Sequence, residues 1–307
     1  MLTIRDLTSD DVADVVAAVQ RDQRIAHRRN RFVNGALDRD ELAEALARRR
    51  ARTWIARDGD RLVGHLTATP LSASSGGPSA WISPDAVSFD RPSTLAHLYA
   101  EAGEQWINDG VLEHVAWVYD RPDAREPWLD LNFAVMFRRG SRAVNTPRET
   151  RLPSGYEGRW ASLDDLDLAV ALTKVIDEAE ARGPSFVAEA PLDRDELATT
   201  LEDPDTMYYV VEHAGEGIAQ CIAFPLLPVR GAYPRTLHLS AVVVQREHRG
   251  RGVATAMLND VLTGARNRGF DYVDVTWRTA NSAAAAFWTA YGLTPTYVRL
   301  RRLVDRR

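Results

Sequence analysis

The chain has 307 residues but only one cysteine, Cys221. A single thiol cannot form an internal disulfide and cannot build a metal site that needs several cysteines. No stretch approaches the roughly 18 consecutive apolar residues that a membrane-spanning helix needs. The first residues, MLTIRDLTSDD, carry acidic side chains where a signal peptide has its apolar run. These absences predict a cytoplasmic protein with no bound metal and no membrane association.

Basic residues are also fewer than acidic ones. Against 43 acidic residues the chain has 38 basic ones, of which Lys174 is the only lysine, and the formal net charge is −5. Domains that mainly bind nucleic acid are usually basic, so we expect no nucleic-acid partner. The composition, with 45% hydrophobic and 26% charged residues, is that of an ordinary globular protein. Its length suits two domains of about 150 residues each.

A weak internal repeat supports this division. Trp54–Leu71 aligns without gaps on Tyr209–Leu226, and in each copy two strand-like runs flank a polar turn and end in Pro-Leu. Further along, Trp128–Phe133 parallels Trp288–Leu293. One unit used twice predicts a pair of homologous domains, which we place at residues 1–145 and 153–307.

Periodicity in the second half predicts strands that alternate with helices. Hairpins combined with one strand–helix–strand crossover indicate an α+β fold, in which each domain has a mixed, mostly antiparallel sheet flanked by helices. The elements are expected near Tyr156–Ala161, Asp164–Ala181, Met207–Glu212, Ile218–Leu226, Thr236–Val244, Gly250–Asn267, Tyr272–Trp277, Ser282–Tyr291 and Thr296–Leu303.

The most informative motif is HRGRGVATAML, which begins at His248. A strand, a turn with Gly250 and Gly252, and an amphipathic helix would direct unpaired N–H groups at an anion such as a phosphate. The P-loop pattern GxxxxGK is absent. A dinucleotide fingerprint is one alternative, although its last position is Thr255, and the acids Asp271 and Asp274 would then bind a ribose.

A second interpretation accounts for more of the sequence. Arg249-Gly-Arg-Gly-Val-Ala254 resembles the pyrophosphate loop of the GNAT superfamily of acyl-CoA-dependent N-acyltransferases. Leu239–Val244 is similar to the strand that precedes this loop in the family. Asn281-Ser-Ala-Ala-Ala-Ala-Phe-Trp288, followed by Gly292-Leu293, is similar to its N-x-x-A-x-x-F-Y segment. The resemblance covers about 60 residues, and the pair of halves resembles tandem members of the family.

The resemblance implies a role for each matching residue. Acetyl-CoA is the expected cosubstrate, and backbone N–H groups from Arg249 to Thr255 would bind its pyrophosphate. The strand before the loop would contact the pantetheine arm of the cosubstrate. Asn281 and Trp288 would lie beside the same arm. Alternatively, Asn281 would serve as a helix N-cap. The complete set of expected cosubstrate-binding residues is Val242, Val243, Val244, Arg249, Gly250, Arg251, Gly252, Val253, Ala254, Thr255, Asn281 and Trp288.

Acyl transfer to an amine needs a base, because a lysine-like amine is almost entirely protonated near neutral pH. We expect His238 to be this base, with a strand histidine held by a neighbouring group as the alternative. The family often places a tyrosine where this chain has Trp288. Tyr291, three positions later, is therefore the expected acid, although it could instead be core. Cys221 is expected to be buried packing.

The first half has no comparable loop, since its matching segment is Ala86–Leu95, with Pro92 in place of a glycine. We expect a degenerate domain that binds no CoA. The segment Asp164–Glu216 has 15 acidic and three basic residues, which would suit a cationic acceptor or merely a solvated face. The sequence therefore predicts N-acetyl transfer to a small amine or an amino terminus. A non-catalytic CoA-binding or regulatory module is the alternative, and a dinucleotide-binding enzyme is a minor one.

Overall fold

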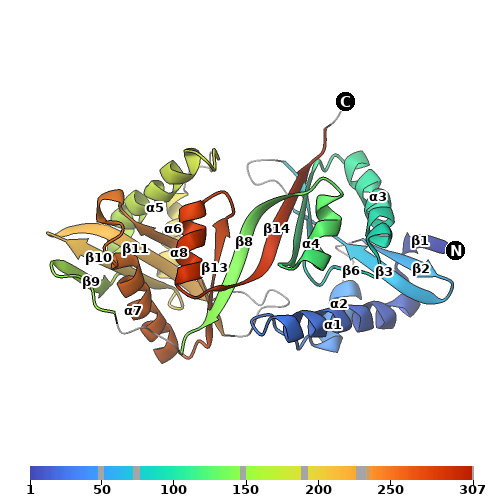
Figure 1. Cartoon of the computed structure of the whole chain (residues 1–307), viewed down its shortest axis with the longest axis horizontal. Helices are drawn as coiled ribbons and strands as arrows, with labels where there is room; N and C mark the ends of the chain where they lie inside the picture. The colour runs from blue at the N-terminus through green and yellow to red at the C-terminus, as the bar shows by residue number, and fades with distance from the viewer. Residues whose placement is uncertain are drawn as a thin grey trace. The chain divides into compact units, whose positions relative to one another are not determined.

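The computed structural model describes residues 1–47, 52–71, 77–145, 150–187, 193–225, 233 and 235–305. The chain forms two compact units (Figure 1). Unit 1 consists of Met1–Arg138 and Pro295–Arg307, together with Tyr233 from an intervening segment. Unit 2 consists of Arg139–Leu227 and Pro234–Thr294. These units are defined by contacts, whereas the ranges 1–145 and 153–307 describe a repeat in the sequence, so that division stays a prediction.

Unit 2 is an α+β domain around a strongly twisted sheet. Its strands follow the order β9-β10-β11-β12-β13, and every neighbouring pair is antiparallel except β12 and β13. The elements are β9 Tyr156–Trp160, α5 Leu166–Ala181, α6 Arg194–Glu202, β10 Met207–His213, β11 Glu216–Pro225, β12 Thr236–Val244, α7 Val253–Asn267, β13 Tyr272–Arg278 and α8 Ser282–Ala290.

Unit 1 has the same order of elements, but its strands divide into two groups. One has the order β1-β2-β3-β6, and in the other β4, β5, β7 and β14 are successive neighbours. The elements are β1 Leu2–Asp6, α1 Val12–Arg29, α2 Arg39–Ala47, β2 Thr53–Asp58, β3 Arg61–Thr67, β4 Thr69–Leu71, β5 Ser79–Ile82, β6 Val87–Phe89, α3 Pro92–Asn108, β7 Glu113–Tyr119 and α4 Pro122–Leu129.

Two strands link the halves of the sequence. β8, Ala134–Ala143, begins in unit 1 and ends in unit 2. The last strand, β14 at Thr294–Leu303, was expected to close the second half, but it pairs antiparallel with β7 from Tyr297↔Tyr119 to Leu303↔Glu113. The end of the chain therefore completes unit 1.

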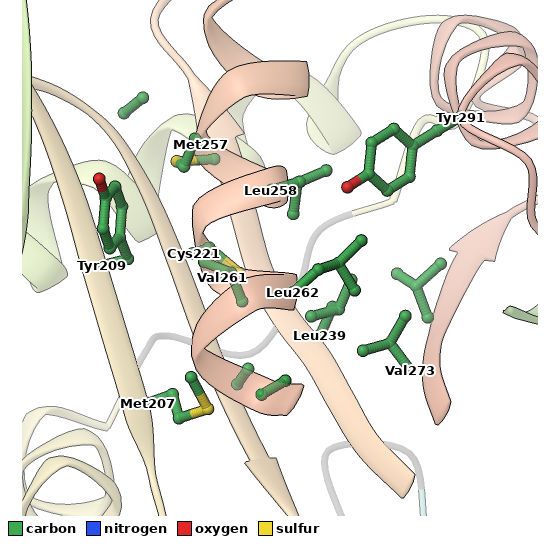
Figure 2. Packing of buried hydrophobic residues seen from close by; sticks show 14 of the residues in the cluster. Met207, Tyr209, Cys221, Leu239, Met257, Leu258, Val261, Leu262, Val273 and Tyr291 are labelled. Carbon is green, nitrogen blue, oxygen red and sulfur yellow. The ribbon is translucent and has the colours of Figure 1, made fainter. Parts of the chain in front are cut away.

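The core of unit 2 has one layer on each face of its sheet. On one face, α7 buries the apolar stripe that the sequence predicts, and Leu258 and Leu262 are fully inaccessible to solvent (Figure 2). Burying one such side chain contributes about 1.5–3 kcal/mol. On the other face, α5 and α6 pack Ala169 and Leu197 against Tyr208, Val210 and Ile222.

The predicted α+β fold is confirmed, and β12 begins and ends at the predicted residues. Helix α7 begins at Val253, later than the predicted Gly250, because both glycines lie in the preceding loop. Helix α6 was not placed from the sequence. The mostly antiparallel pairing does not fit the dinucleotide-binding alternative, which needs a parallel, doubly wound sheet.

Candidate active site

The site is built where two parallel strands of unit 2 separate. β12 and β13 pair from Thr236↔Tyr272 to Leu239↔Val275, and their register goes no further within the described residues. Beyond that point β12 continues along β11 alone, as far as Ala219↔Val244. Between the part of β12 that pairs with β13 and the part that pairs with β11 alone lies a β-bulge, in which two residues of β12 lie opposite the single residue Ile222 of β11. The bulge turns the end of β12 away from β13 and opens the sheet there.

The hydrogen-bond pattern shows which backbone groups face this opening. The N–H of Gln245 donates to the carbonyl of Ile218 at 2.9 Å, which makes Ala219 and Val244 a non-hydrogen-bonded pair. The N–H groups of Val244 and Val242 therefore point away from β11, toward the β13 side. Val243 alternates with them, and its backbone belongs to the ladder with Gln220.

The glycine loop begins directly after β12. Gly250 has φ +74° and Gly252 has φ +84°, a region that only glycine enters without strain. A Cβ at either position would meet nothing within 4 Å, so both glycines border open space. Gly252 is the N-cap of α7 and provides no side-chain cap, so the first-turn N–H groups at Val253, Ala254 and Thr255 remain directed outward.

The two loop arginines differ in their surroundings. The Nε of Arg249 donates to the carbonyl of Val244 at 2.8 Å and so ties the loop to the end of β12. Arg251 is exposed. Arg249 thus has a structural function whatever its contact with a ligand, while Arg251 is a solvent-exposed charge.

His238 belongs to a buried network of three charged or polar side chains. Its Nδ1 lies 2.6 Å from Oδ1 of Asp274, its register partner on β13. The other carboxylate oxygen of Asp274 accepts from Nε of Arg139 at 2.6 Å. Asp274 is completely buried, whereas the His238 side chain is 19% exposed. The arrangement fixes the imidazole ring and leaves its Nε2 atom for other contacts.

The sequence reasoning missed Arg139 and gave Asp274 only a ribose-binding role. A charged residue inside the apolar run YVDVTW was the available signal, because such a residue is rarely buried without a partner. Arg139 comes from β8, far away in sequence, and no local pattern identifies it.

Tyr291 and His238 lie on opposite faces of the sheet. Leu237 and Leu239 belong to the α7-side core, so His238 between them faces α5 and α6. Tyr291 is in the α7-side core, only 3% exposed, beside Leu258 (Figure 2). Its hydroxyl donates to Oδ1 of Asn259 at 3.1 Å. The structure therefore does not bring the two predicted catalytic side chains together.

The remaining predicted residues are accounted for locally. Oδ1 of Asn281 accepts from the N–H of Ala284 at 3.0 Å, which is the N-cap geometry foreseen as its alternative. Trp288 is 5% exposed and packs in the α7-side core. Cys221 is fully buried, and desolvation raises its pKa to about 12, as expected of a packing residue.

Unit 1 repeats this architecture without the loop. In unit 1, β5 pairs parallel with β7, and β6 pairs with β3 at Gly64↔Phe89. In unit 2, the single strand β12 makes both kinds of pair, parallel with β13 and then antiparallel with β11 at Ala219↔Val244. Between Phe89 and Pro92, the first residue of α3, only two residues intervene, against eight between Val244 and Val253. Pro92 also supplies no N–H. The first copy lacks the anion cradle.

Comparisons with known proteins agree with this architecture. Residues 172–293 match the model of the acetyltransferase (GNAT) family. A GCN5-related N-acetyltransferase from Sphaerobacter thermophilus has a TM-score of 0.64 and 17% identity, over 99% of this chain and 96% of that one. A tandem GNAT protein from the clavulanic acid biosynthesis pathway has a TM-score of 0.54 and 17% identity, over the whole of both chains. No curated protein matches significantly.

Within the described ranges, none of the helices has the length and apolar character required to cross a membrane. The family match covers the strand, loop and helix that form the opening in unit 2, and the two structural matches extend over both units. Residues 172–293 therefore match the acetyltransferase (GNAT) family, and the chain has the fold of tandem GNAT proteins.

Proposed function

We propose that unit 2 transfers the acetyl group of acetyl-CoA to a primary amine of a small molecule or an amino terminus. The observation that carries this proposal is the opening between β12 and β13, which ends at a glycine loop and an uncapped helix N-terminus. Each element suits one part of the cosubstrate. The sheet opening suits the extended pantetheine arm, and the loop suits the doubly charged pyrophosphate.

The loop suits a pyrophosphate for two reasons. First, Gly250 and Gly252 allow the backbone to approach the ligand, since no side chain projects from either into the open space. Second, the N–H groups from Arg249 to Thr255 lie at the positive end of α7. A charge-assisted hydrogen bond contributes roughly 1.5–3 kcal/mol, so three or four of them would outweigh a substantial part of the association cost.

The opening also suits the thioester. The Val242 and Val244 N–H groups point toward the β13 side, where they can donate to the pantetheine amide and to the thioester oxygen. When the amine attacks the carbonyl carbon, negative charge develops on that oxygen. A fixed N–H from Val242, the nearer of the two to His238 on β12, would stabilise it without reorganisation. Val243 was predicted to bind the cosubstrate together with Val242 and Val244. Its N–H belongs to the hydrogen-bond ladder between β11 and β12, so Val243 would contribute through its place in that ladder and not by donating to the ligand.

We assign the role of general base to His238. With Nδ1 held by Asp274, the neutral ring has its lone pair on Nε2, which would take a proton from the acceptor's ammonium group and so produce the neutral amine that attacks. The new C–N bond forms as the C–S bond breaks, and CoA leaves as a thiolate. A thiol has a reference pKa of about 8.5, so the thiolate is a good leaving group and can take its proton from water.

The acceptor side of the site is acidic. α5 and α6 lie on the same face as His238 and belong to the segment Asp164–Glu216, which has 15 acidic and three basic residues. Burial raises the pKa of Asp177, and the neighbouring Glu180 raises it further. The Glu180 carboxylate is itself bound by Arg278 at 2.5 Å. An acidic face of this kind favours a cationic acceptor, which would be deprotonated only at the base.

The deciding experiment measures thiol release from acetyl-CoA with a panel of amines. We expect turnover in the wild type, and we expect Gly252→Asp to lower kcat/KM for acetyl-CoA at least about 100-fold by placing an anion in the cradle. Gly215→Asp is the matched control. Gly215 also has a positive φ, +82°, and open surroundings, but it lies in the β10–β11 turn.

Other outcomes have distinct meanings. Tight CoA binding with no turnover on any amine would favour the non-catalytic CoA-binding module. Failure to bind CoA at all would refute the assignment of the loop. Equal losses in Gly252→Asp and Gly215→Asp would show that the effect is general destabilisation.

A further inference from the structure

Unit 1 contains a cleft of about 690 Å³. Its walls are the C-terminal half of α1, β6 with the first residue of α3, the end of β7, and α4. β6 pairs with β3 whereas β7 pairs with β5, so the cleft lies where these two strands diverge. It is the counterpart of the opening between β12 and β13 in unit 2. Its volume is within the range of small-molecule sites.

The cleft is unsuited to acyl-CoA. The connection to α3 is too short to form an anion cradle, and Pro92 in the cleft wall has no N–H to donate. Carboxylates outnumber guanidinium groups in the walls, which would repel three phosphate groups. The charged lining residues are Arg21, Arg29, Arg121, Asp22, Asp90, Asp123, Glu126 and Asp130.

Two hydrogen-bond donors in the walls point to a ligand that carries an acceptor. Arg121 is the N-cap residue of α4, the position that Asn281 has in α8. Its Nε lies 3.1 Å from Oδ1 of Asp123, another wall residue, whereas its Nη1 atom is buried and has no acceptor among the described residues. Trp128 is fully buried, and its Nε1 also has none among them. Buried donors are normally satisfied, so a carboxylate bound beside Arg121 would complete the site.

An acidic group lies in the wall of the same cleft. Asp22, on α1, is held by Nε of Arg21 at 3.1 Å. Burial raises its pKa despite the opposing effects of Arg21 and Arg121. The carboxylate is therefore incompletely compensated by the charges around it, and a cationic group in the cleft would stabilise its ionised form.

From these two sets of groups we infer that the cleft of unit 1 binds a small zwitterion, a free α-amino acid, with its carboxylate on Arg121 and its ammonium group on Asp22. This site is separate from the proposed acetyl transfer, since it uses neither the glycine loop nor His238. The degenerate copy would thus have kept the opening between its strands and exchanged the nucleotide ligand for a smaller one.

The test is calorimetric titration of the full-length protein with each of the twenty common amino acids. We expect at least one of them to bind with a stoichiometry of one per chain. Arg121→Gln and Asp22→Asn should each weaken this binding at least about tenfold. Arg125→Gln and Asp14→Asn are the controls. They remove ion pairs with Asp120 and Arg57 from the same two helices, outside the cleft.

Ligand chemistry and a second variant make the result decisive. The amide of the same amino acid lacks the carboxylate and should bind at least about tenfold more weakly, and binding should persist in Gly252→Asp. No binding by any amino acid would overturn the proposal. So would equal affinity for acid and amide, or equal loss in the Arg121 and Arg125 variants, with circular dichroism confirming that each variant is folded.

Discussion

The carboxylate of Asp274 bridges His238 and Arg139, with oxygen-to-nitrogen distances of 2.6 Å to His238 Nδ1 and 2.6 Å to Arg139 Nε. His238 and Asp274 are register partners on the only parallel pair among the strands β9 to β13. The same pairing that ends at the sheet opening therefore sets the orientation of the imidazole. A base positioned in this way does not depend on the substrate for its alignment.

We predict that Asp274→Asn lowers kcat at least about tenfold, while KM for acetyl-CoA changes little, because the amide does not hold the imidazole in one tautomer. The variant breaks the buried ion pair between Asp274 and Arg139, which costs about 3–5 kcal/mol of stability. The double variant Asp274→Asn/Arg139→Met should therefore recover stability in urea unfolding but not the rate. Recovery of kcat in the double variant would contradict the positioning role.

His238→Ala should lower kcat by about 100-fold or more, the usual contribution of a general base. Without the base, the pH dependence of the rate should follow only the deprotonation of the amine itself and so differ from that of the wild type. Parallel pH–rate profiles for the two proteins would exclude His238 as the base.

Tyr291→Phe distinguishes a catalytic acid from a core residue. The hydroxyl is buried and donates to Oδ1 of Asn259, so its removal breaks a buried hydrogen bond and should cost about 0.5–1.5 kcal/mol of unfolding free energy. We expect kcat to stay within about twofold of the wild type. A loss of kcat at unchanged stability would instead support the role predicted from sequence.

The stability of unit 1 should fall in mild acid. Burial lowers the pKa of His65 and of His114 to about 4. The unfolded chain takes up these protons near pH 6.5 and the folded chain does not, so unfolding is favoured as the pH falls from 6.5 toward 4. The shift of each group corresponds to an upper limit of about 3 kcal/mol.

His65→Gln introduces the residue that unit 2 has at the matching position, Gln220. It should reduce the loss of unfolding free energy between pH 7 and pH 5, measured in urea. His97→Gln, at an exposed position on α3, should leave the pH dependence as it is in the wild type. An unchanged slope in His65→Gln would argue against His65 as a source of the acid sensitivity.

The sequence predicts the fold of unit 2 well where the pattern is local. The apolar run of β12 and the stripe of α7 identify those elements, and the glycines locate the loop between them. Helix α6 was missed because RDELATTLE buries only Leu197 and so has little apolar periodicity. The partner of β14 could not be predicted, since an alternating strand shows which face is buried but not which edge it joins.

The candidate site likewise has features that follow from the local sequence and features that do not. Backbone features such as the positive φ angles of Gly250 and Gly252 follow from residue type, and the structure has them. Contacts between distant segments do not follow from local patterns. The substitution of Trp for the family's tyrosine suggested Tyr291 as a replacement, yet Trp288 and Tyr291 both pack in the core beside α7.

The exchange of end strands has a consequence for any attempt to divide the chain. Unit 1 needs residues from Pro295 onward, and unit 2 needs residues from Arg139 onward that precede the sequence joint. A gene cut at that joint would encode two polypeptides, each missing a strand that the other carries. Neither polypeptide would then contain every strand of one unit, so each half of the sequence depends on the other to complete its sheet.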